Sequence, residues 1–110
     1  MGYFAFLGSG IAPVVSEVPT GMLRTGTDYR LGQVSSLDIW TPNPATDNFE
    51  VAIAFTSGES ATSVSYPDGI KWSGTDVSDG VFIPVKNTRY NAAFWFDGAY
   101  VNAVVRGVSI

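Results

Sequence analysis

Two runs of residues with high β propensity, 89–96 and 99–106, flank the dipeptide Asp97-Gly98. This arrangement predicts a β-hairpin with a type I′ turn, because both central residues of that turn need a positive φ, which Asp and Gly tolerate. Alternation along the first strand places Tyr90, Ala92, Phe94 and Phe96 on one face and Asn91, Ala93 and Trp95 on the other. Both faces are apolar near the turn, so we expect this strand to be covered on both sides or to lend one face to a neighbouring subunit.

Short segments with the same alternation recur upstream. Residues 49–55 carry Phe, Val, Ile and Phe at every second position, and residues 36–40 alternate likewise before a turn at 41–44. Shorter β-prone segments lie at 29–31, 63–66 and 80–83. No window has the i, i+3, i+4 spacing of a helix. Together with 12 Gly and 6 Pro, these segments predict an all-β fold, a single antiparallel β-sandwich of jelly-roll or immunoglobulin-like type with about 6–8 short strands.

The length of 110 residues corresponds to one domain. We divide the chain into an extended N-terminal arm, residues 1–10, and a single β-sandwich domain, residues 11–110. The arm carries three large apolar side chains, Phe4, Phe6 and Leu7. They have two interpretations: they close one end of the core, or they dock the domain onto a larger assembly. We take them as candidate assembly residues.

The chain contains neither His nor Cys. This excludes Ser-His-Asp and Cys-His catalysis, zinc sites built from His or Cys, and disulfide frameworks. Only 15% of the residues are charged, the formal net charge is −4, and no basic run occurs, which argues against nucleic-acid binding. No apolar stretch reaches the ~20 residues of a membrane-spanning helix. We therefore expect no enzymatic activity and no cofactor, and neither a nucleic acid nor a membrane as a partner.

Asp76 and Asp79 place two carboxylates in one turn, with Ser78 between them and Gly80 after them. Oxygen ligands at such a spacing suit Ca²⁺, but the segment has only part of the EF-hand spacing and lacks its closing Glu. An Asx-turn, in which the carboxylates bond the backbone or water, explains the same residues. The sequence leaves calcium binding by this loop open, and we predict no metal site.

Trp72 follows Lys71 in a segment that Gly69 and Gly74 bound. In such a loop the indole ring is suited to stack on a sugar, or to plug the core and anchor the loop while Lys71 extends to solvent. We favour the plug and assign Trp72 as a structural loop anchor.

Trp40 and Trp95 fall on strand faces opposite the predicted core residues. Exposed Trp side chains are common anchors at interfaces and common platforms for ligands, so both are candidates for stacking on a ligand. Tyr100 lies near Trp95 across the predicted hairpin, and we take this pair as candidate interface residues. Three roles stay open for Trp95: a subunit interface, a second layer of the core, and a ligand platform.

Four segments together carry a family resemblance: YRLGQVSSLDI at 29–39, FTSGESAT at 55–62, YPDGIKWSG at 66–74, and Arg89-Tyr90. They are similar to a small β domain found in structural proteins of tailed bacteriophages and prophages, such as head-fibre, tail-fibre and baseplate-associated chains. The resemblance spans residues 17–106, and the Lys71-Trp72-Ser73-Gly74 element is its most distinctive part. The family usually has a second Gly after this element, whereas this chain continues with Thr75-Asp76.

The resemblance implies a non-enzymatic structural or accessory protein of the virion, in the role of capsid decoration, head fibre or tail fibre. It also implies a homotrimer that attaches through its N-terminal segment to other virion proteins, such as the capsid or a fibre shaft. No shaft precedes the domain in this sequence, so we expect a free-standing accessory protein rather than a fibre tip. The alternative is a receptor- or glycan-binding β module that uses exposed aromatic side chains for host attachment.

Overall fold

The computed structural model describes residues 13–42 and 49–110. These residues form ten strands: β1 (Val14–Val15), β2 (Thr27–Gln33), β3 (Ser36–Asp38), β4 (Glu50–Ser57), β5 (Ser63–Ser65), β6 (Lys71–Gly74), β7 (Val77–Ser78), β8 (Val81–Phe82), β9 (Thr88–Phe96) and β10 (Val101–Ser109). The described part of the chain contains no helix, and so none that is long and apolar enough to cross a membrane. The prediction of an all-β fold is confirmed.

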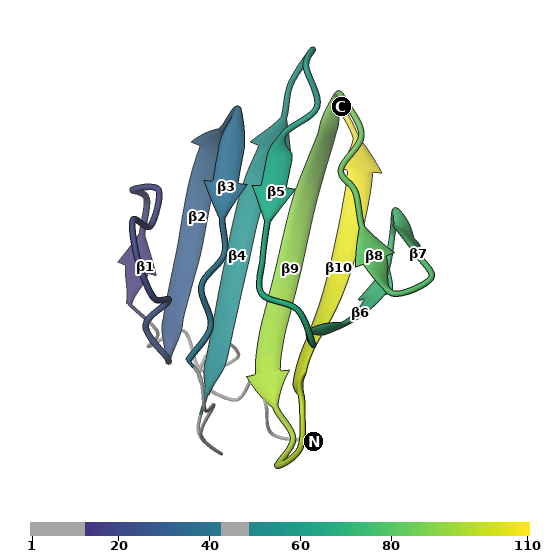
Figure 1. Cartoon of the computed structure of the whole chain (residues 1–110). Helices are drawn as coiled ribbons and strands as arrows, with labels where there is room; N and C mark the ends of the chain where they lie inside the picture. The colour runs from purple at the N-terminus through teal and green to yellow at the C-terminus, as the bar shows by residue number, and fades with distance from the viewer. Residues whose placement is uncertain (1–12, 43–48) are drawn as a thin grey trace.

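Six strands form one large mixed sheet in the order β1-β2-β4-β9-β10-β6 (Figure 1). The central pairs β4–β9 and β9–β10 are antiparallel, whereas β1–β2, β2–β4 and β10–β6 are parallel. Two small sheets, the parallel pair β3–β5 and the hairpin β7–β8, lie on one side of the large sheet. The arrangement is consistent with a β-sandwich whose second layer is smaller than its first.

The structure corrects the expected antiparallel pairing and the expected number of strands. From β2 the chain changes layer to form β3 and returns to the large sheet as β4, and this crossover lets β4 run parallel to β2. β6 likewise enters the large sheet from β5 in the second layer and lies parallel to β10. Alternation along a segment does not report such changes of layer. The two-residue strands β1, β7 and β8 are also too short to show any alternation.

The core lies between the two layers. The large sheet contributes alternate side chains of β4 and β9, among which Val51, Ile53, Tyr90 and Phe94 are fully buried. The second layer contributes Leu37 of β3, which is equally buried. The alternation predicted for these strands is confirmed. Each such side chain stabilises the fold by about 1.5–3 kcal/mol through removal of apolar surface from water.

Trp72 lies on β6, an edge strand that pairs with β10, and not in a loop as the sequence predicts. Its side chain is 6% exposed, and its ring centroid lies 4.8 Å from that of Tyr66, 4.9 Å from that of Phe82 and 5.4 Å from that of Phe94. Gly74 ends the strand with a φ of +115°, so close to the β10 backbone that no side chain fits. The buried ring and this glycine together fix β6 against the sheet.

The predicted hairpin forms between β9 and β10, but its turn is not the two-residue type I′ turn. The first ladder pair, Phe96 and Val101, encloses a four-residue loop, 97–100, in which the Asp97 N–H donates to the Tyr100 carbonyl oxygen at 3.1 Å and Gly98 alone has a positive φ. The Asp97 carboxylate accepts hydrogen bonds from two backbone N–H groups of this loop and so favours the wider turn. The type I′ pattern occurs instead between β7 and β8, where Asp79 and Gly80 have φ values of 51° and 75°.

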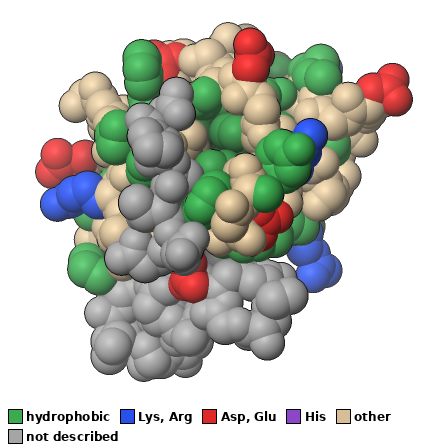
Figure 2. Space-filling view, turned by 60° about the horizontal axis from the view of Figure 1, so that its bottom comes forward, with side chains coloured by type: hydrophobic (Ala, Val, Ile, Leu, Met, Phe, Trp, Pro, Cys, Tyr) green, Lys and Arg blue, Asp and Glu red, His purple; other side chains and the backbone are tan. Residues whose placement is uncertain are grey.

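The β9–β10 loop lies at the lower end of the molecule in Figure 1. When this end is turned forward, hydrophobic side chains reach the surface in several places (Figure 2). Trp40 is 58% exposed and Tyr100 is 52% exposed. Aromatic side chains of this size are mostly buried on average, so two highly exposed ones mark a surface of interest.

Candidate functional site

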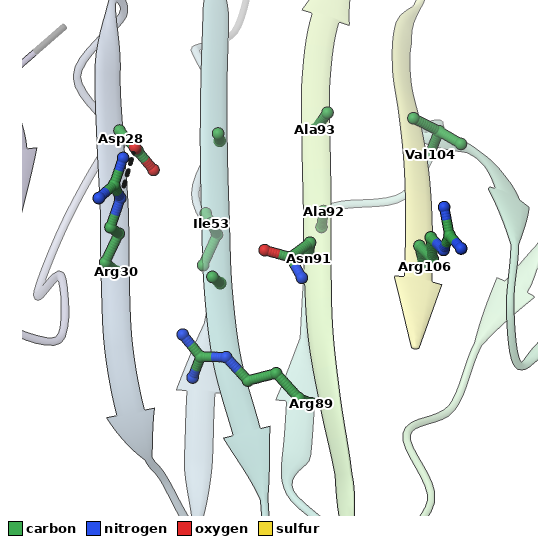
Figure 3. A pocket seen from close by; sticks show the side chains of 11 residues that line it. Asp28, Arg30, Ile53, Arg89, Asn91, Ala92, Ala93, Val104 and Arg106 are labelled. Carbon is green, nitrogen blue, oxygen red and sulfur yellow. Dashed lines mark hydrogen bonds and ion pairs between the residues drawn. The ribbon is translucent and has the colours of Figure 1, made fainter. Parts of the chain in front are cut away.

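The face of the large sheet that points away from the small sheets is open within the described residues. The central side chains on this face are short: Ala52 lies opposite Ala93, and Ala54 lies opposite Asn91. They form the floor of a hollow of about 500 Å³. Three arginine side chains surround this floor, from three different strands (Figure 3): Arg30 on β2, Arg89 on β9 and Arg106 on β10. We call this surface the open face.

Arg89 has a structural task on the open face. Its Nη1 donates to the carbonyl oxygen of Leu31 at 2.6 Å and to Oγ1 of Thr56 at 2.9 Å. The β2–β4 pairing is irregular between Arg30 and Gln33, and Leu31 lies within this irregularity. The guanidinium of Arg89 thus satisfies a backbone acceptor where the strand ladder is interrupted. Figure 3 shows its side chain reaching across β4 toward β2.

The other charged side chains of the open face differ in whether they have a partner. Nε of Arg30 forms an ion pair with Oδ2 of Asp28 at 2.8 Å. By contrast, no described residue forms a hydrogen bond or ion pair with the Arg106 guanidinium or the Glu50 carboxylate. Glu50 shares the open face because it alternates with buried Val51, and burial raises the pKa of its carboxyl above the usual value. The open face therefore carries one charged group of each sign that has no hydrogen-bond or ion-pair partner among the described residues.

The charge balance of the open face is opposite to that of the chain. The face holds three of the six Lys and Arg residues and, of the nine Asp and Glu residues that the structure describes, two, Asp28 and Glu50. The formal net charge of the whole chain is −4. A positively biased face on an acidic protein favours contact with acidic surfaces, among them the remaining surface of its own copies.

The structure separates the predicted interface pair. Trp95 lies half-buried on the open face, where its cross-strand neighbours are Glu50 and Asn102. Tyr100 does not lie opposite Trp95, because the four-residue loop moves Asn102 into that position. Tyr100 instead lines a second hollow, of about 470 Å³, together with Trp40. The two exposed aromatic side chains that the sequence singles out separately thus share one surface.

Of the two carboxylates in the loop left open as a calcium candidate, that of Asp76 has a hydrogen-bond partner in the fold. Oδ2 of Asp76 accepts a hydrogen bond of 2.6 Å from the buried Tyr90 hydroxyl, and Asp79 occupies the turn between β7 and β8. Burial, and next the bond to Asp76, raise the pKa of Tyr90. In the described ranges there is no cluster of three Asp, Glu, His or Cys side chains that could hold a metal ion.

Phe4, Phe6 and Leu7, the candidate assembly residues of the arm, lie outside the described residues. The three arginines of the open face are absent from the sequence-based candidates. Alternation does place Arg89 beside Asn91 and Ala93, and Arg106 beside Val104, on one face. The signal that was missing is the order of the strands, which brings β2 next to β4 and so completes the hollow.

A comparison of the chain with protein-family models, curated proteins and solved structures gives no match. A function for this chain therefore has to be argued from its own surfaces.

Proposed function

We propose that this chain is a non-enzymatic structural or accessory protein of a phage particle, and that it associates with copies of itself through the open face. The self-association rests on one observation, the unmatched opposite charges of Arg106 and Glu50 on a face with a hollow centre. The role in the particle rests on the resemblance of residues 17–106 to phage structural domains. Capsid or fibre proteins are the further partners that this resemblance implies.

A second copy is the partner that fits the open face best. Identical molecules that meet through this face, or around a symmetry axis that it approaches, can bring the cation of one copy to the acid of the next. Pairing also relieves Glu50 of an unfavourable position, since a carboxylate that is desolvated without a partner is destabilised. The hollow above Ala52 and Ala93 gives a protruding side chain of the opposing copy a place to pack.

Apolar side chains on the open face add to this association. Val104 and Val108 of β10 are exposed there, and Trp95 is half-buried. Covering such side chains yields about 25 cal/mol for each Å² of apolar surface removed from water. The resemblance implies a homotrimer, and three copies are therefore the assembly that we expect.

Size-exclusion chromatography with light scattering tests the self-association. We expect the wild-type chain, at high micromolar concentration, to give about three times the chain mass of 11.7 kDa. Arg106→Glu and Glu50→Arg should each shift the mass toward the monomer, because each places like charges together. The double variant should recover the oligomer. Lys86→Glu makes the same change of charge at an exposed position outside the open face and serves as the control.

A monomeric wild-type chain overturns the self-association, and so do charge reversals with no more effect than Lys86→Glu. The role in the particle has a separate test, quantitative mass spectrometry of purified phage particles from the strain that encodes the chain. Stoichiometric amounts of the chain support that role, and its absence from the particles refutes it whatever the oligomeric state.

A further inference from the structure

The hollow shared by Trp40 and Tyr100 lies at the end of the molecule that carries the β9–β10 loop, and we call it the aromatic hollow. Its walls come from three separate parts of the chain: the segment after β3, the turn before β6, and the β9–β10 loop. Pro42, Pro67 and Asp68 complete these walls. We infer that the aromatic hollow binds a neutral pyranose sugar of an oligosaccharide. This inference does not depend on self-association or on a role in a phage particle.

The backbone of Trp40 is held in place by two interactions, and its side chain is exposed. Its carbonyl oxygen accepts a hydrogen bond of 2.9 Å from the Leu23 N–H, and Trp40 forms a parallel β-bridge with Met22. The indole ring nevertheless stays 58% exposed, with hollows on the sides of Pro42 and of Asp38. A large ring with only two rotatable angles on a fixed backbone loses little entropy when a ligand covers it.

Tyr100 is fixed from the opposite side of the aromatic hollow. Oδ1 of Asp97 accepts a hydrogen bond of 2.8 Å from the Tyr100 N–H, and Nζ of Lys71 lies 4.5 Å from the centroid of the Tyr100 ring. The ammonium group covers part of the ring and restrains its orientation. The Tyr100 ring and the Trp40 backbone are thus in place before a ligand arrives, which lowers the cost of binding.

The chemistry of the walls favours a sugar. One face of a pyranose ring presents C–H groups, which pack well on the electron-rich face of an aromatic ring. The hydroxyl groups at its rim are hydrogen-bond donors, and the carboxylate of Asp68, which has no hydrogen-bond partner among the described residues, is an acceptor. A proline-rich peptide also suits aromatic grooves but offers few donors to a carboxylate.

The charge of the aromatic hollow selects for a neutral sugar. Asp68 lines this hollow, and Asp38 lines the adjoining hollow on the other side of Trp40. The nearby cation, Lys71, is already engaged with the Tyr100 ring. Uronic acids and phosphorylated sugars would meet like charge here, which disfavours them.

An array of immobilised glycans, probed with the labelled full chain, tests the inference. The array includes neutral hexopyranose tetrasaccharides, their uronic-acid counterparts and a proline-rich peptide. Calorimetry then measures the affinity for the best neutral tetrasaccharide. We expect Trp40→Ala and Tyr100→Ala each to weaken that affinity about tenfold through loss of one stacking ring. Tyr100→Phe, which keeps the ring, should change it less than about threefold. Ile83→Ala, at a position 66% exposed and outside the aromatic hollow, is the surface control.

Three results would overturn the inference: no neutral glycan bound by the wild-type chain, affinity insensitive to both alanine variants, or a preference for the acidic glycans or the peptide. Circular dichroism checks that each variant is folded, and Asp68→Asn gives a second measure that leaves both rings in place. A several-fold loss of affinity in Asp68→Asn supports the role of its carboxylate. The affinity for a free tetrasaccharide, measured by calorimetry, does not depend on the oligomeric state, so the inference and the proposed function can fail separately.

Discussion

Removal of one buried hydroxyl group, by Tyr90→Phe, should destabilise the whole fold. The Tyr90 hydroxyl donates to Oδ2 of Asp76 at 2.6 Å and accepts from the Val85 N–H at 2.8 Å, so it joins the segments on both sides of β8 to the central strand β9. A hydrogen bond to a charged group contributes about 1.5–3 kcal/mol. The partly buried Val85 N–H also loses its acceptor in this variant. The Phe ring keeps the stacking on Phe55 at 5.3 Å, so no cavity opens. We expect a loss of about 2–3 kcal/mol in the free energy of unfolding.

Urea titration followed by Trp fluorescence measures this loss, with all variants at one protein concentration. Tyr100→Phe is the matched control, because its hydroxyl has no hydrogen-bond partner among the described residues, and it should change stability by less than about 0.5 kcal/mol. The reasoning would be refuted by a loss in Tyr90→Phe below about 1 kcal/mol, or by a loss equal to that of the control.

The same hydroxyl gives the pH dependence a definite sign. Burial, supported by Asp76, raises the pKa of Tyr90 above the usual 10.0. The unfolded chain therefore loses this proton first as pH rises. The contribution is complete below pH 10 and is lost as pH climbs from there through the pKa of the folded state. Tyr90→Phe should lack this part of the alkaline decline, which the difference between the two urea titration series isolates.

Three further predictions concern backbone and loop positions. Gly74→Ala should lower the free energy of unfolding by about 3 kcal/mol or more, or prevent folding, whereas Gly69→Ala should lower it by only about 1 kcal/mol. Equal losses for the two variants in urea titrations would contradict this prediction. The reason is that a Cβ at Gly74 would lie 2.0 Å from the Val105 carbonyl oxygen, while space is open at Gly69. Hydrogen bonds, first that from the Tyr100 N–H, lower the pKa of Asp97 below its usual 3.8, so its stabilising effect is present above pH 3.8 and is lost as pH falls further. Asp97→Asn should flatten this acid limb of the stability curve, and a limb that is unchanged would show that the carboxylate does not hold the loop. Ser57→Ala should cost about 1–2 kcal/mol, measured by thermal unfolding, because the buried Thr62 N–H loses its acceptor at 2.9 Å; a change of only a few tenths would point to water taking its place.

The features that the sequence predicted correctly are local ones. The buried face of β4 and β9 follows from side chains that alternate with a period of two, and this pattern needs no knowledge of neighbours. The exposure of Trp40 follows from the same rule applied to residues 36–40. The turn at 97–100 shows the limit of local rules, because the Asp97 side chain bonds the loop backbone and so widens a turn that Asp-Gly alone would close in two residues.

The features that could not be predicted depend on which strands become neighbours. Parallel pairing of β2 with β4 sets Arg30 beside Ala54, and Arg106 borders the same hollow only because β10 follows β9 in the sheet. Trp40 and Tyr100 are far apart in the sequence and meet because the chain changes layer between β3 and β4. Both hollows thus arise from long-range order, to which single-sequence patterns are blind.

The two proposals together predict avidity. The open face lies along the large sheet, whereas the aromatic hollow lies at one end with the β9–β10 loop, so self-association through the first leaves the second accessible. Several weak sugar sites on one oligomer can strengthen binding to a repeating polysaccharide by about 10²–10⁴ without a new contact. Arg106→Glu should therefore lose most of the binding to an immobilised polysaccharide while it keeps the affinity for a free tetrasaccharide, and the double variant with Glu50→Arg should recover the former. Equal losses for both ligands in Arg106→Glu would instead mean that the open face and the aromatic hollow act as one site.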